Sequence, residues 1–294
     1  MRKMSNKDMD LLYDYISEEP EYNLFIYGDI EAYGLENENL DIWCFEKDGF
    51  IDSILMRFKE YYIPYSKSEK FNVLPVVEKL KELKAKNISG KKYIMDRISL
   101  EMPQLVMTET HLARLNKQFN IYSTGTSSNS SGSSSSNIGS TSSNSICSSN
   151  SSICLSSTAE VKTAKPDDLE EITQFYCEIG EFDTNTRYQR SLERSREYLK
   201  TGTGRFFYMR TDEVISAVAA TTAENSKSAM IVGVATAFKY RNKGFATVVL
   251  KALCNEIFDE GKEFLCLFYY NLSAGRIYER IGFREIGIWT MGKM

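Results

Sequence analysis

Apolar residues recur at three- and four-residue spacing in some parts of the chain and gather in short runs in others. The first spacing predicts amphipathic helices, and the short runs predict strands. Near the N-terminus, Met9, Leu12, Tyr13 and Ile16 predict a helix. We then expect two strands within 40–58 around a turn at 46–49, a strand at 60–65, a helix at 73–90, a strand at 91–98 and a helix at 108–117.

The last part of the chain repeats this order of elements. A helix is expected at 165–180, with Asp167 or Asp168 as its N-cap. The run at 229–238 is mostly apolar, which favours a central strand. The remaining elements are expected to be a helix at 190–202, strands at 205–210 and 214–222, a helix from Ala246 that stops at Gly261, a strand at 263–269, a helix at 271–282 and a strand at 283–291.

Residues 121–158 separate these two parts. The segment is dominated by Ser, Asn, Thr and Gly and carries no charged residue. Such a composition offers too little apolar surface to offset the entropy of ordering, so it predicts a disordered linker. We therefore expect a first domain at 1–120, the Ser/Asn-rich linker at 121–158 and a second domain at 159–294.

Composition narrows the class of protein. A net charge of −4 and a pI near 5.4 argue against nucleic acid or an anionic membrane surface as partner. No apolar run approaches the roughly 18 residues of a membrane span, and the N-terminus lacks the apolar core of a signal peptide, so we expect a cytoplasmic protein. The six cysteines form no CxxC pair and His111 is the only histidine, which disfavours a zinc site.

The hexamer at 241–246, RNKGFA, carries the clearest chemical signal. It follows a predicted buried strand and leads directly into a helix. The first amides of a helix have no internal partners, and a glycine lets backbone approach a bulky ligand, so this turn suits a phosphate or pyrophosphate. The alternative is an ordinary strand-to-helix turn with solvated cations. GxxxxGK[ST] and GxGxxG are both absent, which disfavours the common nucleotide sites.

With this turn in view, residues 159–294 resemble the GCN5-related N-acetyltransferase (GNAT) superfamily. The segment VGVATAFKYRNKGFATVVLKAL resembles the family's strand followed by its (Arg/Gln)-x-x-Gly-x-(Gly/Ala) signature. The segment NLSAGRIYERIGFREIG resembles the family's later Asn…Ala-x-x-x-Tyr-x-x-x-Gly-Phe segment. The resemblance implies an α+β fold, with a mixed, largely antiparallel sheet flanked by helices. It also implies acetyl-CoA as co-substrate and an amine as acceptor. From the absent ligand spacing we expect no metal.

The resemblance also implies roles for individual residues. The backbone of Val234, Ala235 and Thr236 is expected to pair with the pantetheine arm. The turn made by Arg241, Asn242, Lys243, Gly244, Phe245 and Ala246 is expected to hold the pyrophosphate. Asn271 is expected to contact the cofactor, and Tyr278 to protonate the departing thiolate. A core aromatic on the inner helix face is the alternative for Tyr278.

Two questions stay open at this level. No general base is assigned. Glu224, Glu178, Glu181 and Asp183 are candidates, but each pattern is more typical of a solvated loop carboxylate, and loss of the amine proton through ordered water is equally compatible. The first part, which includes NLFIYGDIEAYGL, resembles the N-terminal region of two-part members of the superfamily but has no glycine turn after 60–65. We expect a degenerate, non-catalytic GNAT-like domain there, with an unrelated α+β domain as the alternative. The alternative to a transferase is a non-catalytic acyl-CoA sensor or scaffold.

Overall fold

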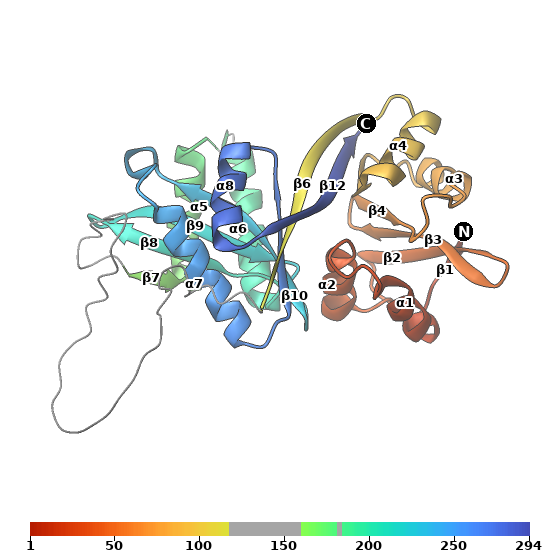
Figure 1. Cartoon of the computed structure of the whole chain (residues 1–294), viewed down its shortest axis with the longest axis horizontal. Helices are drawn as coiled ribbons and strands as arrows, with labels where there is room; N and C mark the ends of the chain where they lie inside the picture. Colours follow the sequence, from red (N-terminus) through yellow and green to blue (C-terminus); the bar gives the residue numbers. More distant parts are fainter. Residues whose placement is uncertain (118–159, 181–183) are drawn as a thin grey trace, which may run out of the picture.

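The computed structural model describes residues 1–117, 160–180 and 184–294 (Figure 1). The predicted linker at 121–158 lies outside the described residues. The first half, residues 1–117, contains β1 (Arg2–Lys3), α1 (Met9–Ile16), α2 (Leu24–Tyr33), β2 (Leu40–Lys47), β3 (Phe50–Phe58), β4 (Tyr61–Tyr65), α3 (Leu74–Glu82), β5 (Asn87–Lys91), α4 (Lys92–Glu101) and β6 (Val106–Asn116).

The second half, residues 160–294, follows the predicted order of elements. It contains β7 (Val161–Thr163), α5 (Leu169–Glu178), α6 (Thr184–Thr201), β8 (Phe206–Thr211), β9 (Val214–Thr222), β10 (Ser228–Thr236), α7 (Phe245–Asp259), β11 (Phe264–Tyr269), α8 (Leu272–Ile281) and β12 (Arg284–Lys293). The helices and strands expected between 165 and 291 are therefore confirmed. Among the described residues, no helix has the length and apolar character needed to cross a membrane.

The strands of both halves join into one sheet. Its order among the described residues is β1-β2-β3-β4-β5-β12-β6-β11-β10-β9-β8-β7. Only β4–β5 and β10–β11 pair in parallel, so the sheet is mixed and largely antiparallel, as expected. Each half gives its last strand to the other, because β6 lies beside β11 and β12 lies beside β5. These two long strands run side by side between the halves (Figure 1).

Helices cover both faces of this sheet. In the second half, α7 and α8 pack over one apolar cluster, whereas α5 and α6 cover the opposite face. In the first half, α3 and α4 cover one face, and α1 and α2 cover the other. Helix α2 also reaches the second half, where its side chains share a core cluster with Met230 and Cys266. A Cβ on Gly28 would lie 2.9 Å from the carbonyl oxygen of Ala223, so α2 approaches the second half at backbone distance.

Three predictions for the first half are wrong. Residues 91–98 lie mostly in helix α4, in which Ile94, Met95 and Ile98 are buried at helical spacing. Residues 108–117 fall in strand β6, although Leu, Ala and Arg favour helix. Pairing with strands on both sides overrides that local preference. The helix expected at 73–90 ends at Glu82, since a turn with Lys84 at a φ of +52° follows and Asn87–Lys91 form β5.

Candidate functional site

The parallel pair of β10 and β11 opens part of the way along its length. The strands pair from Ser228 opposite Phe264 to Ile231 opposite Leu267, and beyond these residues they separate. On its other side β10 stays paired with β9 as far as Thr236. The backbone from Val232 to Thr236 therefore has no partner strand on the β11 side among the described residues. An unpaired strand edge of this kind can bind an extended chain that carries amide groups.

A bulge in β10 stands at this opening. Val232 lies opposite Ala220 and Ala235 lies opposite Val218, so β10 has one extra residue here. Gly233 takes a φ of +60°, and its carbonyl accepts a hydrogen bond from the Tyr176 hydroxyl at 2.5 Å. A Cβ on Gly233 would lie 2.5 Å from that hydroxyl, so only glycine fits without displacement. Helix α5, which carries Tyr176, thereby holds the bulge in place.

The turn at 241–246 follows at the end of β10. Asn242 and Gly244 have φ values of +61° and +82°, and Gly244 is the N-cap of α7. The first hydrogen bond to this cap comes from the Val248 amide, to the Gly244 carbonyl at 3.1 Å. Within the described residues, the amides of 242–247 have no hydrogen-bond acceptor. Consecutive unpaired amides at a helix start form an anion-binding site.

The two cations of the turn are placed differently. The Arg241 Nε donates to the Thr236 carbonyl at 3.2 Å, and its guanidinium lies 4.0 Å from the centroid of the Phe238 ring. Lys243 is exposed, with its ammonium 5.5 Å from the Tyr240 ring centroid. Arg241 is therefore folded against the end of its own strand, and Lys243 is the more available charge. Phe245 is buried under the turn, and Ala246 is half-buried.

Tyr278 and Asn271 lie on and beside helix α8. Tyr278 is buried, with its ring centroid 5.8 Å from that of Tyr269 and 6.2 Å from that of Phe283. Asn271 is exposed just after β11 and caps α8, since its Oδ1 accepts from the Ser273 amide at 2.8 Å. Tyr278 shares the apolar cluster under α7 and α8 with the flank of Val234. Ala235 faces the opposite cluster, under α5.

The four candidate bases differ in burial and in their hydrogen-bond partners. Glu224 is buried and receives hydrogen bonds from Arg205 at 2.7 and 3.0 Å and from the Thr221 hydroxyl. Both of its carboxylate oxygens are thus engaged in an ion pair. Glu178 is exposed on α5, and among the described residues its side chain accepts a hydrogen bond from Gln174 at 3.2 Å. Glu181 and Asp183 lie outside the described residues. Within the described ranges, no three His, Cys, Asp or Glu side chains are grouped as metal ligands.

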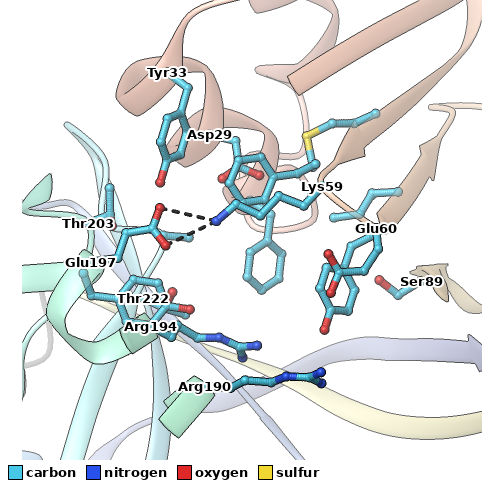
Figure 2. A pocket seen from close by; sticks show the side chains of 18 of the residues that line it. Asp29, Tyr33, Lys59, Glu60, Ser89, Arg190, Arg194, Glu197, Thr203 and Thr222 are labelled. Carbon is cyan, nitrogen blue, oxygen red and sulfur yellow. Dashed lines mark hydrogen bonds and ion pairs between the residues drawn. The ribbon is translucent and has the colours of Figure 1, made fainter. Parts of the chain in front are cut away.

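A cavity of about 460 Å³ lies on the face of the sheet that α2 and α6 cover (Figure 2). Its walls come from both halves: α2, the turn after β3 and α6. Asp29 on α2 has no hydrogen bond or ion pair among the described residues, and burial raises the pKa of its carboxyl to about 7. The sequence pattern did not predict Asp29 as a site residue, although an acidic side chain between the apolar residues Tyr27 and Ile30 is unusual on a buried helix.

Comparison with known proteins identifies a matching family model and several similar solved structures. Residues 168–291 match the family model for GNAT acetyltransferases. No curated protein matches the sequence. A solved GCN5-related N-acetyltransferase-like protein from Streptococcus suis is 13% identical, with a TM-score of 0.54 and coverage of 99% of both chains.

Two other solved structures also align along the whole chain. A tandem GNAT protein from the clavulanic acid biosynthesis pathway is 10% identical, with a TM-score of 0.59, and a Drosophila protein is 11% identical, with a TM-score of 0.64. Each alignment covers 100% of this chain and 97% of the other. Likeness at such low identity shows the fold. Residues 168–291 thus match the GNAT acetyltransferase family, and the whole chain has a fold like that of a tandem GNAT protein.

Proposed function

We propose that this protein transfers an acetyl or short acyl group from acyl-CoA to an amine, by direct attack in a ternary complex. One observation carries the proposal: the unpaired edge of β10 leads directly to the unpaired amides at the start of α7. Pantetheine carries two amides and ends in a diphosphate, so its chemistry matches this order of strand edge and helix start.

In this proposal the backbone of Val234, Ala235 and Thr236 pairs with the pantetheine arm. Residues 241–246 bind the pyrophosphate through their amides, and Lys243 adds charge from its exposed position. Asn271 already caps α8, so we expect it to contact the cofactor through its backbone or its amide nitrogen. The glycine at 244 matters more than either cation, because a side chain there would occupy the place of the ligand.

Tyr278 is proposed as the proton donor to the departing thiolate. The amine nitrogen attacks the thioester carbonyl carbon, the carbon–sulfur bond breaks, and the sulfur takes the Tyr278 hydroxyl proton. The nitrogen loses one proton to solvent, and the Tyr278 phenolate regains one from solvent. A covalent acyl-enzyme is disfavoured because Cys266, the nearest cysteine on β11, is fully buried. Burial raises the pKa of its thiol, which keeps it protonated.

We further propose that the first half binds no acyl-CoA. Its parallel pair, β4 and β5, also separates early, after Tyr62 opposite Ile88. The next residues of β4 include Pro64, which has no amide to donate, and Gly90 approaches so closely that a Cβ would lie 3.1 Å from the Pro64 carbonyl oxygen. Tyr93 also donates to the carbonyl of Ser66, where the next loop starts. This opening is therefore filled by the protein itself.

Calorimetric titration with acetyl-CoA tests the binding site. Gly244→Glu places a carboxylate at the start of α7 and is expected to weaken binding at least tenfold, by repulsion and by steric exclusion. Gly261→Glu is a matched control, because Gly261 also has a positive φ, +102°, but lies after the opposite end of α7 with open space around it. Equal affinity in the wild type and Gly244→Glu contradicts the proposal.

Release of CoA thiol over a panel of amines tests the chemistry. Tyr278→Phe is expected to lower kcat with little change in acetyl-CoA affinity, whereas Tyr269→Phe, which alters a neighbouring ring, serves as the control. A sensor or scaffold, the competing function, would bind acetyl-CoA and release no thiol with any amine. That result would end the transferase proposal and keep the binding site.

A further inference from the structure

One pair of stacked rings connects the cavity of Figure 2 to the opening between β10 and β11. Phe25 lines the cavity and stacks on Phe268 with ring centroids 6.2 Å apart. Phe268 is the first residue of β11 beyond its pairing with β10. Thr222, also in the lining, lies opposite Met230, which is just before the separation. The cavity therefore adjoins the opening on the face opposite α7 and α8, where a second substrate can enter without crossing the bound acyl-CoA.

Asp29 supplies this cavity with a carboxyl group that makes no hydrogen bond or ion pair among the described residues. The cation that faces it is Lys59, whose ammonium is held by Glu197 on α6 at 3.2 and 3.3 Å (Figure 2). Asp29 itself has no ion pair or hydrogen bond among the described residues. A half-buried carboxylate without a partner is costly in free energy, and such groups gather where ligands bind. An ammonium group from outside would supply the missing partner.

Two guanidinium groups stand on the other side of the cavity. Arg190 and Arg194 are one helical turn apart on α6, and both side chains extend from the helix into the space of the cavity (Figure 2). Within the described part of the chain neither makes an ion pair, although Glu60 and Glu193 also line the cavity. Arg196, by contrast, is paired with Glu170 at 2.9 Å. Two free guanidinium groups at this spacing suit a carboxylate or a phosphate.

We propose that this cavity is the acceptor site, and that its acceptor is a small amine that also carries a carboxylate or phosphate. Asp29 binds the ammonium group, and Arg190 and Arg194 bind the anion. The inference rests on the proposed transferase function. A volume of about 460 Å³ fits a small molecule and not a folded partner.

The position of Asp29 also indicates which group takes the first proton from the bound ammonium. The bound ammonium gives one proton to the Asp29 carboxylate, which passes it to solvent, and the neutral nitrogen then attacks the thioester carbon. The nitrogen loses a second proton as the amide forms, and the thiolate gains one as the carbon–sulfur bond breaks. One proton is thus released for each transfer. The pKa of about 7 for Asp29 makes this carboxylate a better base than an ordinary aspartate at neutral pH.

Matched amine pairs test the proposal on the full-length protein with saturating acetyl-CoA. The probes are phenylalanine with phenethylamine, and glucosamine 6-phosphate with glucosamine, so that each pair differs by one anionic group. We expect kcat/KM to be at least tenfold higher for the anionic member of one pair. The pair that shows this difference tells whether the acceptor carries a carboxylate or a phosphate. The double variant Arg190→Gln with Arg194→Gln is expected to abolish that difference through KM. Arg196→Gln, on the same helix, is the control.

Asp29→Asn is expected to lower kcat/KM at least tenfold for both members of the responding pair and to remove the acidic limb of the pH profile near 7. Glu78→Gln, an exposed carboxylate of the first half, is the control. The same amines titrated calorimetrically into the CoA-saturated protein report acceptor binding without transfer. If acetyl-CoA binds and amines react, but neither pair discriminates by charge, only the acceptor inference is overturned. The same holds if Asp29→Asn is fully active. If acetyl-CoA does not bind, the proposed function fails instead.

Discussion

His111 stacks on Tyr269 with ring centroids 4.9 Å apart, although the two residues come from opposite halves of the chain. They are direct neighbours across the pair of β6 and β11, and His111 Nδ1 lies 3.1 Å from Glu285 on β12. The contact exists because β6, from the first half, lies between two strands of the second. Each half thus completes the other's sheet and core.

This exchange of strands predicts that the halves do not fold separately. A chain divided between residues 117 and 160 is expected to give two fragments that are poorly soluble when produced alone. Each would expose the long edge that β6 or β12 covers. Produced together, the fragments are expected to copurify and to unfold in one cooperative transition, as followed by circular dichroism. A cooperative transition in either fragment by itself contradicts the prediction.

The bulge at Gly233 predicts a second outcome. Gly233→Ala adds a Cβ 2.5 Å from the Tyr176 hydroxyl at a φ of +60°, so we expect a loss of about 1–3 kcal/mol in the free energy of unfolding and weaker acetyl-CoA binding. Gly49→Ala is the matched control, because Gly49 has a φ of +83° with open space around its Cβ position. Urea unfolding should show a smaller loss there, and an equal loss would mean that only backbone strain matters.

The raised pKa of Asp29 predicts how stability depends on pH. The titratable groups that face or line its cavity come from α2, from the turn after β3 with the start of β4, and from α6: Tyr33; Lys59, Glu60 and Tyr61; and Arg190, Glu193, Arg194, Glu197 and Tyr198. The folded protein holds the Asp29 proton up to a pH of about 7 and the unfolded chain releases it near 3.8, so stability falls as the pH rises through this window.

Asp29→Asn keeps the neutral form at all pH values. We therefore expect the variant to be more stable than the wild type at pH 8, by about 1–3 kcal/mol after allowance for partial exposure, and equally stable near pH 4. Urea unfolding at several pH values, with Glu78→Gln as the control, measures this difference. A variant that is less stable at pH 8 would mean that Asp29 has a favourable partner.

The ion pair of Glu224 predicts a structural role. Glu224→Gln leaves Arg205 paired with Glu260, at 2.8 Å, but removes a buried charge partner, so we expect a loss of about 1–3 kcal/mol in the free energy of unfolding. Thiol release per folded molecule is expected to stay within about twofold of the wild type, because Arg205 and Thr221 already engage both oxygens of the Glu224 carboxylate. A drop of tenfold or more would restore Glu224 as a candidate base.

Much of the second half was predictable from sequence, because its signals are local. Helical spacing and glycine stops identified α7 and α8, and the apolar run at 229–238 identified β10 as an inner strand. The turn at 241–246 could be recognised because a glycine, two cations and a helix start stand next to one another in the chain. The separation of β10 from β11 could be expected only through the family resemblance.

The sequence by itself therefore determined the order of elements in the second half and the residues of the turn that we propose binds an anion, since both depend on neighbours along the chain. Only the tertiary structure decided that 108–117 is a strand, because its partners lie more than a hundred residues away. It alone also decided that Asp29, Arg190 and Arg194 share one cavity. A carboxylate acquires a raised pKa and a free binding position from what surrounds it in space, and the linear pattern does not contain that information.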